Sequence, residues 1–197
     1  MNRGLAGVLL ATSIVAAAPA CDREPELPVL ATVPDFSLVD DRGRPFGGRD
    51  LEGHVVVADF IFTRCTTACP MLTAQMSNFR RRLGPRAERV RFVSFSVDPD
   101  YDTPEVLRAY AEGVGADPER WWMLTGPRAT IDGLMPSFVA KNQRAEPGTA
   151  PVGEFVTHQT RLWVIDAQGR IRGIYSGESD EHLELIAARA RFLEGAK

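Results

Sequence analysis

The chain has 197 residues, of which 25% are charged and 44% are hydrophobic, and its net charge is −3. This composition is typical of one globular domain and excludes wholesale disorder. A weakly acidic chain also lacks the positive charge excess of nucleic-acid-binding proteins, so we expect no nucleic acid as a partner. The one basic run, at residues 80–82, is expected to be a solvent-exposed helix face.

The first twenty residues have the pattern of a secretory signal. Arg3 is the only charged residue before Asp22, and a run of apolar and small residues follows it. Cleavage after residue 20 would leave Cys21 at the new N-terminus, so the segment also fits a bacterial lipobox, although Ala18 stands where a lipobox usually carries Leu. An uncleaved anchor is a third reading, but the apolar run is short for a membrane span.

These features predict an exported protein of the bacterial periplasm. We expect residues 1–20 to be a signal peptide, of the secretory or the lipoprotein type, and residues 21–33 to be a charged, Pro-containing tether. Residues 34–197 would form the domain. Lipidation of Cys21 would give the protein its membrane contact through the N-terminus. No apolar stretch of about 20 residues follows, so the body of the protein is not expected to span a membrane.

The remaining sequence alternates strand-like and helix-like segments. Residues 55–62 are nearly all apolar and β-prone, which predicts a strand buried on both faces. The spacing of Leu72, Met76, Phe79 and Leu83 predicts an amphipathic helix that ends at residue 84. The other expected elements are a short strand at 36–39, a strand at 90–97, a helix from the N-cap Thr103 to 113, a helix at 130–139, a surface loop at 141–154, a hairpin at 161–166 and 171–175, and a helix at 180–193. This order predicts an α/β, thioredoxin-like fold, with a central mixed β-sheet flanked by helices in a single domain.

Cys65 and Cys69 follow the predicted buried strand and lead into the helix. In an oxidising compartment they could form a structural disulfide, but so short a loop would contribute only about 2 kcal/mol. We therefore favour redox chemistry or metal binding. Cys65 would lie near the helix N-terminus, where the partial positive charge lowers a thiol pKa, and Cys69 would lie on the same face or just below it. Two thiolates suit Cu(I), and also Zn.

A third metal ligand could come from a histidine. His54 precedes the buried strand, far from the cysteines, and His182 is expected to be solvated in the first turn of the last helix. His158 lies between the loop and the hairpin, where its position leaves open a metal ligand or a hydrogen-bonded structural histidine. Met71 and Met76 are expected to fill the core rather than to bind metal.

Several motifs together are specific, although none would be so alone. They are FIFTRCTTACP (60–70), VDPDYDTP (97–104), LTG (124–126), and His158 followed by LWVIDAQG (162–169). With them the chain resembles the Sco/SenC family, whose members are exported or membrane-tethered thioredoxin-fold proteins that bind copper and help assemble cytochrome c oxidase. The similarity covers about residues 34–195. The resemblance implies that Cys65, Cys69 and His158 hold copper, as Cu(I) or Cu(II).

Two positions depart from the family pattern. Thr66 stands where Pro usually follows the first cysteine, and Thr157 stands where an acidic residue commonly precedes the histidine. A carboxylate beside a ligand imidazole can orient it and raise its basicity. Its absence is expected to weaken or retune copper binding, and it keeps a thiol redox role open.

Two functions follow from this reading. In the favoured one, a copper chaperone carries copper on Cys65, Cys69 and His158 to a copper-receiving subunit of a respiratory oxidase, or to another periplasmic copper or thiol protein. In the alternative, an exported thiol–disulfide oxidoreductase, Cys65 attacks a partner's disulfide and Cys69 resolves the mixed disulfide without obligatory metal. That activity would prepare the thiols of a copper centre. An inactive thioredoxin-like interaction module and a peroxidase have less support.

Overall fold

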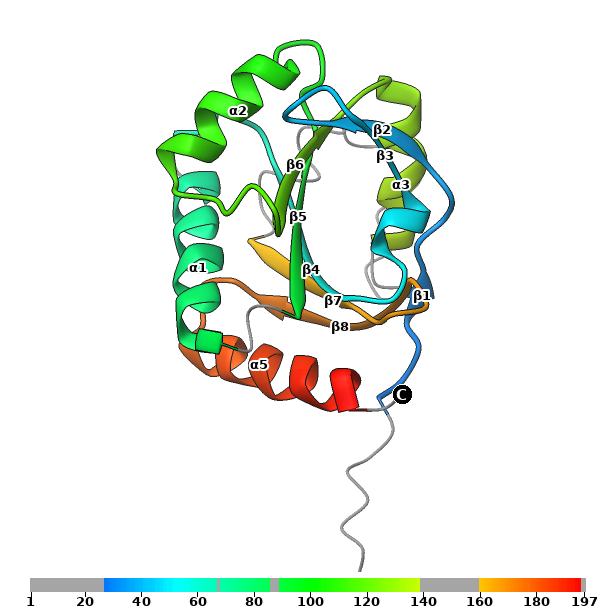
Figure 1. The fold of residues 1–197 in the computed structure, drawn as a ribbon, viewed down its shortest axis with the longest axis vertical. Helices are drawn as coiled ribbons and strands as arrows, with labels where there is room; N and C mark the ends of the chain where they lie inside the picture. The colour runs from blue at the N-terminus through cyan, green and yellow to red at the C-terminus, as the bar shows by residue number, and fades with distance from the viewer. Residues whose placement is uncertain (1–26, 67, 86–88, 139–159, 196–197) are drawn as a thin grey trace, which may run out of the picture.

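The computed structural model describes residues 27–66, 68–85, 89–138 and 160–195 (Figure 1). Within these ranges an eight-stranded mixed sheet has the order β1-β8-β7-β4-β5-β6-β2-β3. The strands are Ala31–Thr32 (β1), Ser37–Asp40 (β2), Pro45–Gly47 (β3), Val55–Ile61 (β4), Val90–Ser96 (β5), Trp121–Thr125 (β6), Arg161–Ile165 (β7) and Arg170–Ser176 (β8). The helices are Gly48–Leu51 (η1, a 3₁₀ helix), Ala68–Leu83 (α1), Pro104–Gly113 (α2), Arg128–Phe138 (α3) and Asp180–Gly195 (α5).

The centre of the sheet is parallel. β4 pairs with β5 from Val55–Val90 to Ile61–Ser96, and β5 pairs in parallel with β6. Parallel neighbours need a crossover, which α1 supplies between β4 and β5 and α2 supplies between β5 and β6. On its other side β4 pairs antiparallel with β7. The carboxyl ends of β4 and β5 therefore meet at one edge of the sheet, which is where the cysteines follow.

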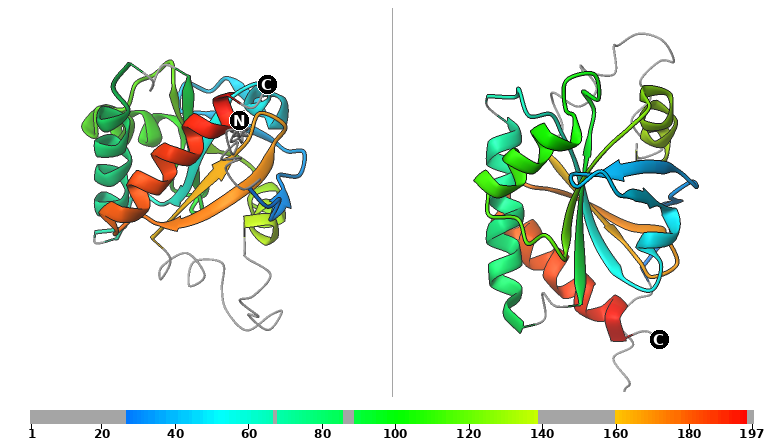
Figure 2. Two further views of the ribbon diagram at one scale, coloured as in Figure 1. Left: turned by 90° about the horizontal axis from the view of Figure 1, so that it is seen from below. Right: turned by 45° about the horizontal axis from the view of Figure 1, so that its top comes forward.

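Helices cover both faces of the sheet, and each face has its own core (Figure 2). On one face α1, α2 and α5 pack against alternate residues of β4, including Val57 and Ile61. On the other face α3 and η1 pack against Val56 and Phe60, where Phe138 and Trp163 contact the Phe60 ring edge-on. Since both faces of β4 are covered, every residue of this strand is buried, as its apolar sequence predicts.

Most predicted elements are present, with their ends shifted by at most two residues. Thr103 caps α2 by accepting a hydrogen bond from the Val106 N–H, with Pro104 at the first helical position. The basic run lies in the last turn of α1, where Arg81 and Arg82 are exposed as expected. The predicted loop at 141–154 lies outside the described residues. No helix in the described ranges is long and apolar enough to cross a membrane.

Two features differ from the sequence prediction. The expected tether at 21–33 is too long, because Leu27 is buried and β1 pairs with β8 through Ala31 and Ile171. The N-terminal segment is thus part of the domain from Leu27 onward. The predicted elements also lack β3, η1 and β6; for β6, a mostly apolar run of five residues fits a strand and a buried helical segment equally well.

Candidate dithiol site

The two cysteines lie at the junction between β4 and α1. Cys65 is half-buried in the connection, and Cys69 is buried in the first turn of α1. The Cys69 N–H donates a hydrogen bond to the Cys65 sulfur at 3.3 Å, and the Cys65 N–H donates to the Phe62 carbonyl at 3.1 Å. No disulfide joins these two residues. The Cys65 sulfur therefore occupies the helix N-terminus, the position expected from the sequence, where a negative charge is favoured.

The two sulfurs have different environments. Burial raises the pKa of Cys69 to about 12, and the nearby Cys65 and Asp59 add to this effect, while a backbone hydrogen bond at Phe62 opposes it. The free protein thus holds Cys69 as a thiol, and a metal or a disulfide bond must displace its proton. Because Cys65 is the more exposed of the pair, an incoming protein or ion meets Cys65 first.

A buried carboxylate fixes the connection that carries Cys65. Asp102 is fully buried and accepts hydrogen bonds from both the N–H and the hydroxyl of Thr63, the latter at 2.5 Å. It also accepts a hydrogen bond from the Ser96 hydroxyl at 2.5 Å. These bonds link the chain after β4 to the chain after β5, so the backbone two residues before Cys65 is held by a side chain far away in sequence.

A second link lies outside the first, at the surface. Arg64 donates to one oxygen of Asp98 through Nε at 2.9 Å and through Nη2 at 2.5 Å. Its guanidinium also lies over the Tyr101 ring, 4.6 Å from the centroid. The hydrogen bond from Arg64 to Asp98 raises the pKa of the guanidinium above its usual range. The residue directly before Cys65 is therefore held by the loop after β5.

Asp59 is a buried acid close to the thiols. Asp59 is fully buried in β4. It lies on the face covered by α1, because it is two residues from both Val57 and Ile61, which belong to the core on that face. Neither carboxylate oxygen has a hydrogen-bond partner among the described residues. Burial raises the pKa of Asp59 to about 7. The charge of Asp59 acts on Cys69, whose pKa it raises. A single carboxylate within an otherwise apolar strand is the sequence signal that could have identified this residue.

The structure brings together two of the three predicted ligands. Cys65 and Cys69 are adjacent, whereas His158, together with Thr157 and Cys21, lies outside the described residues. Across the described ranges, no three His, Cys, Asp or Glu side chains gather in a metal-binding group. Thr66 is exposed, in a bend beside Cys65. The ligand set therefore stays a prediction, and the dithiol is the part of it that the structure positions.

Other predicted side-chain environments can be compared directly. His54 lies in the turn before β4 and is half-buried. The prediction that His182 is solvated is wrong, because its Nδ1 accepts the Ser176 N–H at 3.0 Å and its ring packs edge-on against Tyr175. Met76 is fully buried, but Met71 is 42% exposed and is not core filler. Met71 falls on the outer face of α1 because it is two residues from the buried Cys69.

A mixed sheet between helices, with a dithiol where a central strand enters the first helix, defines a thioredoxin-like domain. Within that class, the profile of SCO1/SenC matches residues 25–194, and the chain belongs to this family. The structure of a SCO1/SenC family lipoprotein from Bacillus anthracis str. Ames is 36% identical, with a TM-score of 0.71 over 84% of this chain and 96% of that one. BsSco, a member of the Sco family of cytochrome c oxidase assembly proteins with a disulfide switch, is 30% identical, with a TM-score of 0.73 over 86% and 97%. Copper-bound ScoI of Bradyrhizobium japonicum is 25% identical, with a TM-score of 0.65 over 83% and 99%. These matches confirm the predicted fold class.

Proposed function

We propose that this protein carries copper, with Cys65, Cys69 and His158 as ligands, and delivers it to the copper centre of a respiratory oxidase. The observation that carries the proposal is the placement of two adjacent sulfurs at the N-terminus of α1, one reachable and one buried. Membership of the SCO1/SenC family and the copper-bound relative support the choice of metal. Copper is the cargo here and not a resident cofactor.

The donor set suits transfer. Thiolates are soft ligands that select Cu(I), and an imidazole nitrogen extends the site to Cu(II). Three protein ligands leave the ion incompletely enclosed, so the sulfurs of a receiving protein can replace them one at a time. The half-buried Cys65 is the ligand that such a partner reaches first, while the buried Cys69 releases the ion last.

We further propose that the protein acts outside the cytoplasm, at a membrane surface. Residues 1–20 act as the export signal, Cys21 carries the lipid, and the short segment before Leu27 connects the lipid to the domain. The related lipoprotein of Bacillus anthracis supports this arrangement. The mass of the mature protein, isolated from a native membrane fraction, tests it: lipidation predicts a mass above that of residues 21–197, and an unmodified mass in the soluble fraction contradicts it.

Copper titration tests the ligand assignment. The wild-type protein should bind one copper per chain and show a sulfur-to-copper charge-transfer band as Cu(II). Cys65→Ser or Cys69→Ser should each abolish tight binding, because each removes a soft ligand. Cys21→Ser is the matched control, since it makes the same change at the third cysteine and should leave the stoichiometry unchanged. If the Cys65→Ser, Cys69→Ser double variant binds one copper as tightly as wild type, the site lies elsewhere.

A thiol–disulfide oxidoreductase is the second candidate function. The contact between Cys69 N and the Cys65 sulfur favours it, because it places the two residues within one helical turn, with Cys65 placed to attack and Cys69 to resolve. The disulfide switch of BsSco is a related property of a relative.

His158→Ala separates the two functions. A carrier should lose most of its Cu(II) affinity and its ability to load the oxidase, whereas the disulfide potential should change little. If His158→Ala keeps full biological activity while Cys65→Ser loses it, the thiol–disulfide role replaces copper carriage.

A further inference from the structure

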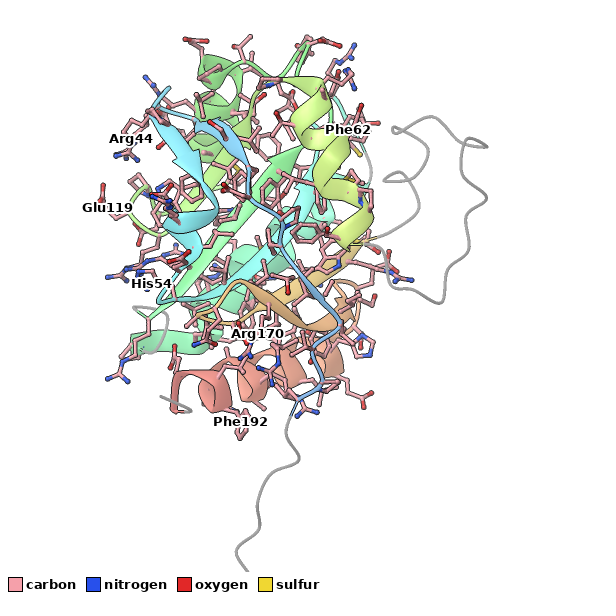
Figure 3. All side chains as sticks on the ribbon, turned by 90° about the vertical axis from the view of Figure 1, so that its right-hand side faces the viewer. Arg44, His54, Phe62, Glu119, Arg170 and Phe192 are labelled. Carbon is pink, nitrogen blue, oxygen red and sulfur yellow. The ribbon has the colours of Figure 1, made fainter. Side chains whose placement is uncertain are left out.

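A cavity of about 490 Å³ lies at the end of the sheet where β4 and β5 begin. The turn before β4, the turn between β7 and β8, and the end of α5 surround it. Its charged lining consists of Arg89, Arg91, Arg170, Arg172, Asp166 and Glu194. Figure 3 shows Arg170 and Phe192 at this end, and Phe62, next to the dithiol, at the other. The cavity is therefore separate from the dithiol site.

The lining carries more positive than negative charge, with four arginines and two carboxylates. Asp166 accepts hydrogen bonds from Arg172 at 2.7 Å and from Arg170 at 2.8 Å. Burial acts to raise the pKa of Asp166, but these arginines outweigh it and hold the pKa below its usual value. One carboxylate thus serves two guanidinium groups, and Arg89 is exposed with no ion pair among the described residues.

The N-terminal segment enters the domain beside this cavity. The Leu27 carbonyl accepts a hydrogen bond from Arg172 Nε at 3.1 Å, and β1 runs along β8 as far as Arg170. Between Leu27 and β1, the consecutive apolar residues Val29 and Leu30 are 51% and 40% exposed. Exposed apolar side chains beside arginines are typical of surfaces that contact lipid headgroups.

The length of the segment before Leu27 sets the orientation. Five residues lie between Cys21 and Leu27, and the six fully extended steps from one to the other span at most about 20 Å. β4 alone, with seven residues, is about 23 Å long. A lipid on Cys21 is therefore held near the end of the sheet where Leu27 contacts Arg172, and this favours a bilayer on the side of the cavity.

We propose that this end of the domain rests on the membrane, and that the arginine-lined cavity binds the phosphate groups of anionic phospholipids. The inference rests on the anchoring proposed above and adds the ligand and the orientation. Arginines near an anionic surface are attracted to it, and salt screens this attraction. The dithiol then faces away from the bilayer, toward a partner whose copper-receiving groups project from the same membrane.

Amide hydrogen exchange of the mature lipidated protein tests the proposal. The protein is reconstituted in vesicles of phosphatidylcholine alone, or of phosphatidylcholine and phosphatidylglycerol in equal parts. We expect exchange at residues 27–33 and 166–172 to slow by at least about threefold on the anionic vesicles, and the effect to disappear at high salt. The double variant Arg89→Gln, Arg91→Gln should lose the protection. The matched control Arg128→Gln, Arg161→Gln, with the same loss of charge near the dithiol end, should keep it.

Three results would overturn the proposal: equal protection on neutral and anionic vesicles, protection at residues 62–66 and 98–102 instead, or the same protection from inorganic phosphate without vesicles. The last result would assign the cavity to a free anion. Copper stoichiometry of the Arg89→Gln, Arg91→Gln variant should equal that of wild type, so a failed copper assignment is distinguishable. A mature protein without lipid by mass would identify failed anchoring instead.

Discussion

Both ends of the central sheet bury carboxylates, but with different partners. At the end where β4 and β5 stop, Asp102 accepts hydrogen bonds from neutral hydroxyl and N–H groups, and Asp59 has no hydrogen-bond partner among the described residues. At the end where these strands begin, Asp166 is paired with Arg170 and Arg172. The first arrangement adds negative charge close to two thiols, whereas the second leaves an excess of positive charge around a cavity.

The difference shows how partners decide what a buried acid does. An acid with cationic partners stays charged and contributes to stability as long as both partners are present. One with several neutral donors positions the chain segments that supply them. A buried acid without hydrogen-bond or ion-pair partners lowers the stability of the fold whenever it is ionised. Removing the charge of each acid in turn should therefore have effects of different size and sign.

The largest loss is expected at the cavity end, from Asp166→Asn. This change leaves Arg172, which is only 7% exposed, without its counter-charge. Breaking a buried pair in this way should lower the free energy of unfolding by about 3 kcal/mol. Urea unfolding measures the loss. Asp180→Asn, which removes the exposed partner of Arg82, is the control and should cost less than about 0.5 kcal/mol. Equal losses in the two variants would show that burial does not set the energy of these pairs.

The opposite sign is expected for Asp59→Asn. The folded pKa of Asp59, about 7, lies above its ordinary value of 3.8, so the folded protein binds this proton more tightly than the unfolded chain does. The stabilising contribution is complete below the ordinary value and is lost as the pH rises through about 7. In wild type the free energy of unfolding should therefore fall by about 2–4 kcal/mol from acidic to mildly alkaline pH.

Asp59→Asn should remove most of this pH dependence and be the more stable protein above about pH 8. Unfolding by urea across the pH range measures both effects. The exposed Asp100, changed to Asn, serves as the control and should retain the wild-type slope. A wild-type slope in Asp59→Asn would mean that Asp59 does not titrate in this range.

A smaller loss is expected for Asp102→Asn. The amide keeps the shape of the side chain but replaces hydrogen bonds to a carboxylate by weaker neutral ones, which should cost about 2 kcal/mol. Because these bonds hold Thr63, the connection to Cys65 should also loosen and Cys65 should react faster with a thiol reagent. Asp102→Glu, which keeps the carboxylate but not its reach, tests whether the position of the charge matters. Unchanged stability together with unchanged Cys65 reactivity in Asp102→Asn would contradict the positioning role.

What the sequence predicts well is local. The apolar run of β4, the periodicity of α1 and the Thr103-Pro104 cap each specify their element within a few residues, so the strand-to-helix junction that carries Cys65 and Cys69 follows directly. The resemblance of the chain to the Sco/SenC family then adds His158, whose role stays a prediction.

What the sequence does not reveal depends on contacts between distant segments. Nothing near His182 indicates that the Ser176 N–H would bond to its ring, because α5 must first dock on β8. Similarly, the burial of Leu27 depends on β1 pairing with β8. Asp102 lies 39 residues from Thr63, so its function as a link appears only once β4 and β5 are neighbours.

The smallest effect is expected at Thr103, the residue after Asp102, and it sharpens the comparison at the dithiol end. Thr103 is exposed, and its hydroxyl caps α2 by accepting the Val106 N–H at 3.4 Å. Thr103→Ala should cost about 1 kcal/mol, since water can replace part of the lost bond, and Thr103→Ser should cost only a few tenths. Unlike Asp102→Asn, neither variant should alter the reactivity of Cys65, because Thr103 makes no hydrogen bond to the β4–α1 connection among the described contacts. Urea unfolding and thiol kinetics on the three variants test this separation. If Thr103→Ala speeds the reaction of Cys65 as much as Asp102→Asn does, general loosening of the loop, and not the buried carboxylate, controls access to the dithiol.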